Sequence, residues 1–197
     1  MQSQPARRET IRSLAGELTR AGLRLGGLGL VAIGLSGVVA AVFGTSFGQS
    51  FVAGDQPGLT YTAARCADFK EYAPHARSCE QAATTHHYGE VVDYRLAAGV
   101  LGVLALLVWW LLRRRHAGPS TLPETFEVTV ATVLFGLAAG VLLLQSLGTS
   151  LGGDSSGVGG LLSAGLVSAV AAGWSSVILV RRLLELPDGV SGQVGAA

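Results

Sequence analysis

One short segment of the sequence carries the side chains best suited to chemistry, two histidines followed by two carboxylates. His86, His87, Glu90 and Asp93 fall within little more than two helical turns. On a helix, His86, Glu90 and Asp93 share one face at i, i+4 and i+7, and His87 lies three residues before Glu90. Imidazole and carboxylate groups at this spacing are ligands for zinc or a similar divalent ion. The same residues also suit a polar helix that enters a membrane at headgroup level, so both interpretations stay open.

No other segment of the sequence has the pattern of an active site. The sequence contains no G-x-S-x-G, H-E-x-x-H or phosphate-binding glycine motif. Its long apolar blocks contain no Asp, Glu, Lys, Arg or His, which disfavours proton relays, ion-coupled carriers and voltage sensors. All four histidines lie outside these blocks, which disfavours haem held by transmembrane histidines. We therefore expect no cofactor other than the divalent metal of the His86–Asp93 hypothesis.

Two cysteines predict a structural bond in the same part of the chain. Cys66 and Cys79 are the only cysteines and flank Pro74. The sequence predicts a short helix over residues 62–72, a break at Pro74, and a second helix over residues 76–93 that continues into the next apolar block. A Cys66–Cys79 disulfide would join the two helices into a small cap, stabilised by about 3 kcal/mol in the chain-entropy model. Two free thiols are the alternative if this loop faces a reducing compartment.

Four long apolar segments must position these residues. The 197 residues are 49% hydrophobic and 14% charged, whereas soluble domains are about 25% charged. A net charge of only +1 argues against a nucleic-acid partner. The uncharged blocks have about the 20 residues that a helix needs to cross a bilayer, and a chain in lipid must be helical there. A cleaved signal peptide is the rival interpretation of the first block, but its polar lead of 24 residues is long.

The arginines predict the orientation of these spans. They cluster before the first block, after the second and after the fourth, at positions 7, 8, 12, 20 and 24, 113–115, and 181–182. The loop at residues 148–157 has no basic residue, and the loop at residues 44–95 has four basic residues against six acidic ones. The positive-inside rule therefore places both termini in the cytoplasm.

The predicted fold is an all-α integral membrane protein. It is a four-transmembrane-helix bundle, N-in and C-in, with a small disulfide-stapled helical cap in the first extracytoplasmic loop. Its segments are a cytoplasmic amphipathic helix (1–24), TM1 (25–43), the extracytoplasmic loop and cap (44–95), TM2 (96–112), a cytoplasmic loop (113–127), TM3 (128–147), a short extracytoplasmic loop (148–157), TM4 (158–180) and a cytoplasmic tail (181–197). Within the first loop, glycine, serine and aromatic residues predict irregular chain over residues 44–61.

Small residues at four-residue spacing predict close helix contacts. They occur in the first span at Ala32, Ser36, Ala40 and Gly44. The predicted interface residues are Gly136, Gly140, Gly165, Ala169 and Gly173. The last three form a second row on the fourth span, whose first row runs from Gly160 to Ser176. One bundle needs only one row, so an interface with another chain and packing within the chain are both open.

The sequence favours two classes of function, and a third is an alternative. The first is a non-catalytic accessory, scaffold or assembly subunit that acts through helix contacts and the outer cap. The second is a homo-oligomeric channel or carrier subunit, and the third is a membrane enzyme with a metal site at its outer surface. The expected partners are the lipid bilayer and other membrane proteins or copies of the chain itself. One lysine against thirteen arginines indicates a high-GC bacterial genome, so we expect the plasma (inner) membrane of such a bacterium.

Overall fold

The computed structural model describes residues 4–54, 61–115, 124–153 and 156–184, and all regular structure there is α-helical. The six helices are α1 (Gln4–Phe47), α2 (Gln49–Ala53), α3 (Ala63–Tyr72), α4 (Cys79–Arg115), α5 (Glu124–Leu151) and α6 (Val158–Leu184). Four of them, α1, α4, α5 and α6, are long and apolar enough to cross a membrane. The expectation of an all-helical chain with four such helices is confirmed. The tail expected at residues 185–197 lies outside the described residues.

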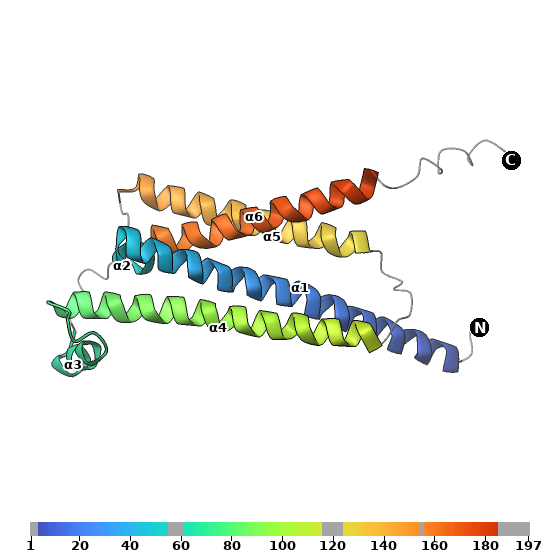
Figure 1. Cartoon of the computed structure of the whole chain (residues 1–197), viewed down its shortest axis with the longest axis horizontal. Coiled ribbons are helices and arrows are strands. Elements are labelled where there is room, and N and C mark those ends of the chain that lie inside the picture. The colour runs from blue at the N-terminus through green and yellow to red at the C-terminus, as the bar shows by residue number, and fades with distance from the viewer. Residues whose placement is uncertain (1–3, 55–60, 116–123, 154–155, 185–197) are drawn as a thin grey trace.

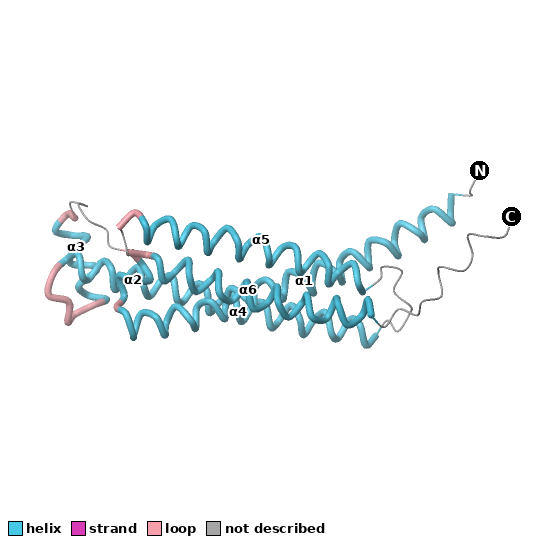
Figure 2. The backbone as a smooth tube through the Cα atoms, turned by 90° about the horizontal axis from the view of Figure 1, so that it is seen from above, coloured by secondary structure: helices cyan, strands magenta, loops and turns pink. Residues whose placement is uncertain are grey.

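The long helices form two pairs that run along one axis (Figures 1 and 2). Helix α1 packs along α4, and α5 packs along α6, while the contact of α1 with α6 joins the two pairs. Within the described residues, no Cα atom of α4 comes within 8 Å of a Cα atom of α5 or α6. We call the end that holds α2, α3 and the start of α4 the hairpin end, and the end where α1 begins and α6 finishes the terminal end.

The lengths of α1 and α4 exceed what a bilayer can contain. Helix α1 has 44 residues and α4 has 37, so at 1.5 Å per residue they are about 66 and 55 Å long. A hydrocarbon core is about 30 Å thick. The amphipathic segment expected before the first span is continuous with it in α1, and its position on a membrane surface stays a prediction.

Glycines bring the backbones of α1 and α4 into direct contact. A Cβ atom added to Gly99 would lie 2.8 Å from Cα of Gly34, and one added to Gly102 would lie 2.8 Å from the carbonyl oxygen of Gly27. Gly34, Gly99 and Gly102 therefore have no room for a side chain. These glycines, together with Gly37, are not members of the small-residue row expected on the first span, but Ser36, Ala40 and Gly44 of that row are also buried.

The expectation of irregular chain over residues 44–61 is wrong for residues 44–53. Helix α1 continues to Phe47, and α2 follows after a break at Gly48, whose φ of 100° favours glycine. Aromatic rings at four-residue spacing contact one another here: the Phe47 ring lies edge-on to that of Phe43 at 6.0 Å and tilted against that of Phe51 at 5.4 Å between centroids. The aromatic residues thus pack on one another across the break. Residues 55–60 lie outside the described residues.

Candidate functional site

The hairpin end is built on the α3 and α4 helices expected around Pro74. Thr62 caps α3, accepting a hydrogen bond from the Arg65 backbone N–H at 3.4 Å. Cys66 of α3 is bonded to Cys79, the first residue of α4, with their Cα atoms 5.5 Å apart. The predicted disulfide is therefore confirmed.

A side-chain cap that sequence reasoning missed fixes the start of α4. Ser78 Oγ accepts a hydrogen bond from the Gln81 backbone N–H at 3.0 Å, and the Gln81 side chain accepts one from the Arg77 N–H at 2.9 Å. This is close to a capping box, and the S-x-x-Q spacing at 78–81 is its sequence signature. The cap and the disulfide together hold the first turn of α4.

An aromatic cluster joins α3 to α4. The ring of Phe69 lies 5.6 Å from that of Tyr61 and 5.3 Å from the imidazole of His86. Tyr72 lies edge-on to the same imidazole at 5.0 Å. His86, a candidate metal ligand in the sequence, is therefore part of the packing that joins α3 to α4.

The histidine–carboxylate segment does not form a compact ligand set. Glu90 Oε2 lies 3.7 Å from His86 Nδ1 and 3.6 Å from His87 Nδ1, while the Asp93 side chain is exposed farther along α4. Within the described part of the chain, no three His, Cys, Asp or Glu side chains are grouped so that they could hold one metal ion. This geometry favours a packing role for His86 and a hydrated surface role for Glu90. Metal binding by this segment stays an untested prediction.

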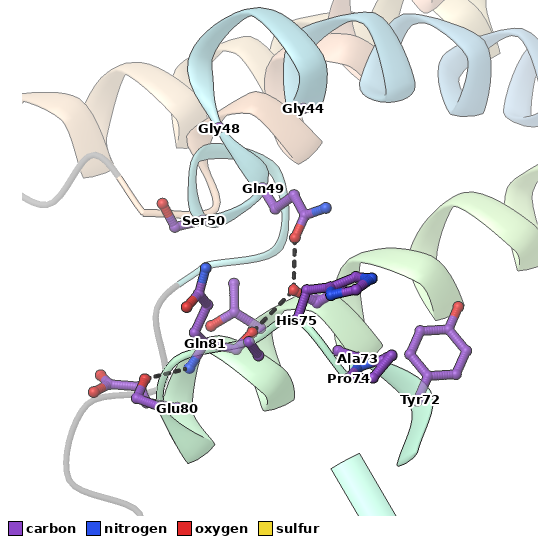
Figure 3. A pocket seen from close by; sticks show the side chains of 14 residues that line it. Gly44, Gly48, Gln49, Ser50, Tyr72, Ala73, Pro74, His75, Glu80 and Gln81 are labelled. Carbon is purple, nitrogen blue, oxygen red and sulfur yellow. Dashed lines mark hydrogen bonds between the residues drawn. The ribbon is translucent and has the colours of Figure 1, made fainter. Parts of the chain in front are cut away.

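A polar pocket of about 800 Å³ opens at the hairpin end, between α2, the turn after α3 and the first turns of α4 (Figure 3). Thr85 Oγ donates to Gln49 Oε1 at 2.8 Å, a bond that ties α2 to α4 across the pocket. The His75 imidazole and the Glu80 carboxylate also line it. Amide, hydroxyl, imidazole and carboxylate groups together suit a polar ligand or peptide segment held by hydrogen bonds.

Arg95 has a structural role that the sequence did not predict, because there it was counted only as one of the charges of the loop at residues 44–95. It lies within α4, and its Cβ atom occupies the space above Gly37 of α1. Its guanidinium donates to Ser163 Oγ at 2.9 Å and to the Gly160 carbonyl oxygen at 3.1 Å, both on α6. Arg95 thus bridges two helices whose backbones do not meet.

The five predicted interface residues fall into two groups. Gly136, Gly140 and Gly173 are exposed, and a Cβ atom added to any of them would meet nothing within 4 Å. Gly165 is buried, and its added Cβ atom would lie 2.8 Å from Leu143 of α5. Ala169 is half-buried. The row of Gly165, Ala169 and Gly173 therefore begins inside the α5–α6 contact and ends on an open surface.

The fold and these sites are consistent with a multi-pass membrane protein. Comparison of the chain with protein-family models, curated proteins and solved structures finds no match.

Proposed function

We propose that this chain is a non-catalytic assembly or accessory subunit of a bacterial inner membrane, with both termini in the cytoplasm. The arginine distribution supports this orientation. The Cys66–Cys79 bond agrees with it, because disulfides persist on the oxidising side of a membrane. The hairpin end would then present its polar pocket outside the cell membrane.

The observation that carries the proposal is the outward face of α5. Gly136 and Gly140 form an exposed G-x-x-x-G pair at which an added Cβ atom meets nothing within 4 Å, and large exposed apolar side chains such as Leu137 and Leu144 flank it. Such pairs let a second helix approach closely in lipid, where packing rather than the hydrophobic effect drives association. A homo-oligomeric channel or carrier is the second candidate, because the same face could also join copies of this chain.

The test replaces each glycine with leucine and measures the mass of the detergent-solubilised assembly. Neither Gly136→Leu nor Gly140→Leu meets a neighbour within the chain, so folding should persist while the assembly becomes smaller. Gly26→Leu is the matched control, because Gly26 is also exposed with nothing within 4 Å of an added Cβ atom. Foreign chains lost from the assembly support the accessory subunit, and loss of a symmetric homo-oligomer supports the channel. An assembly unchanged by both substitutions contradicts the proposal.

The orientation has its own test. Cysteines introduced at Ser120 and Ser155 should react with a membrane-impermeant reagent from the cytoplasmic and the outer side respectively. Labelling of the Ser120→Cys variant in intact cells contradicts the orientation.

A further inference from the structure

An apolar groove lies where the backbones of α4 and α6 do not meet. It has a volume of about 810 Å³, and all four long helices line it. Leu107 and Trp110 of α4 form one wall, Val170 and Trp174 of α6 form the other, and Leu28 of α1 lies between them. Because these side chains are exposed by 38–73% and line a cavity inside a membrane-spanning region, lipid chains have access to it.

Cationic side chains gather where this groove approaches the terminal end. Arg24 pairs with Glu127 across α1 and α5, and its guanidinium lies 5.2 Å from the centre of the Trp109 ring. The guanidinium of Arg113 lies 5.5 Å from the same ring, and that of Arg114 lies 3.8 Å from the ring of the following tryptophan. Arg113 and Arg114 do not line the groove themselves but contact tryptophans that do, so together with Arg24 they place three guanidinium groups beside this end of the groove.

We infer that this groove binds one anionic phospholipid, with an acyl chain between α4 and α6 and the phosphate at the arginine rim. An apolar groove that ends in a cationic rim matches the two parts of such a lipid. Guanidinium groups bind phosphate oxygens through paired hydrogen bonds, and basic residues beside a membrane attract anionic headgroups. This site is independent of the proposed assembly face, because Gly136 and Gly140 do not line the groove.

The size of the groove favours a lipid chain over a protein helix. A helix with side chains is at least about 10 Å wide, so three turns of it occupy about 1,250 Å³. The groove holds about 810 Å³. A flexible acyl chain is narrower and can follow the uneven wall of tryptophan, leucine and valine side chains.

The three tryptophans of the chain provide a direct readout, because Trp109, Trp110 and Trp174 all line this groove. The purified full chain in a non-ionic detergent is titrated with phosphatidylglycerol that carries bromine on one acyl chain, a quencher of tryptophan fluorescence. Quenching should saturate near one lipid per protein. Unbrominated phosphatidylglycerol should restore the fluorescence by competition. Phosphatidylcholine should need at least about a fivefold higher concentration to do the same. Native mass spectrometry should show one retained lipid on each chain.

Two variants separate the rim from the groove. Arg113→Gln and Arg114→Gln should each weaken binding by about fivefold, the equivalent of about 1 kcal/mol per basic residue beside a membrane. Ala171→Phe fills the groove and should abolish saturable quenching, whereas Ala97→Phe, at an exposed position of α4 outside the groove, should not. If Ala171→Phe fails to fold, the affinities of the two arginine variants for phosphatidylglycerol test the inference on their own.

Three results would overturn the inference. The first is quenching that rises in proportion to brominated lipid without saturation. The second is equal competition by phosphatidylcholine and phosphatidylglycerol, which would leave the arginine rim without a role. The third is a doubled mass that Ala171→Phe abolishes, because it would assign the groove to a second copy of the chain.

Discussion

The two sides of α4 differ in how they meet the rest of the molecule. On the side of α1, Gly99 and Gly102 lie directly against the α1 backbone. On the side of α6, one long side chain, Arg95, donates hydrogen bonds to Ser163 and to the Gly160 carbonyl oxygen. Beyond that bridge the two helices are separated by the groove that contains Trp110 and Trp174.

The difference parallels side-chain size, because glycines lie at the close α1–α4 contact and large side chains line the groove. Lipid is as apolar as leucine, so large apolar side chains gain little in a membrane by burying themselves against each other. Glycine gives backbones close packing, and the α1–α4 contact uses it. Large side chains of α4 and α6 line the space between those helices, and that space suits a lipid chain.

A large side chain placed at the glycine contact between α1 and α4 should have the largest effect on stability. A side chain at Gly34 would collide with the backbone of α4 at Gly99, so Gly34→Leu should cost about 3 kcal/mol or more, at the upper end of overpacking penalties. Thermal melting in detergent measures the loss. Gly29→Leu is the matched control, because a Cβ atom there meets nothing within 4 Å. Equal melting of the two variants would show that the α1–α4 contact is not set by glycine.

Removing the disulfide at the hairpin end should have the next largest effect on stability. It should change neither the α1–α4 contact nor the groove between α4 and α6. Cys66→Ser removes the cross-link to α3, and the chain-entropy model gives a loss of about 3 kcal/mol for a loop of this size. We expect lower thermal stability of the hairpin end, with membrane insertion unchanged. Two thiols that react freely in folded, freshly prepared wild-type protein would contradict the bond.

Removing the bridge to α6 should have a smaller effect on stability. Arg95→Met loses two hydrogen bonds from a charged donor, each worth about 1.5–3 kcal/mol at most, offset by the lower cost of burying an uncharged side chain. We expect a net loss of about 1–2 kcal/mol in melting. Arg77→Met, at an exposed position before α4, is the control and should melt like the wild type. A stabilised Arg95→Met variant would show that the bridge costs more than it contributes.

The sequence predicts the elements well because hydropathy and proline placement are local signals. The four uncharged blocks lie inside the four long helices, and Pro74 separates α3 from α4 as expected. The Cys66–Cys79 bond follows from the presence of a single cysteine pair on two adjacent helices. None of these features depends on how the helices pack.

The packing partners were not predictable in the same way, because several small-residue rows compete in each span. Only the three-dimensional arrangement shows that Gly34 faces Gly99, while Gly136 faces away from the chain. Arg95 was missed because a single charge beside an apolar block is usually an interfacial residue. His86 has ligand chemistry in the sequence, but in the fold its imidazole contacts the rings of Phe69 and Tyr72.

The most direct test of the two unlike sides of α4 is disulfide trapping in native membranes. Gly27→Cys with Leu106→Cys joins α1 to α4 at a point where an added Cβ atom lies 2.9 Å from the leucine Cγ. Leu107→Cys with Trp174→Cys spans the groove, where described Cα atoms of α4 and α6 are more than 8 Å apart, beyond the reach of about 7 Å for a disulfide. We expect the first pair to form a disulfide rapidly under mild oxidation and the second pair to form none. Bonding of the second pair, or failure of the first, would contradict this difference between the two sides of α4.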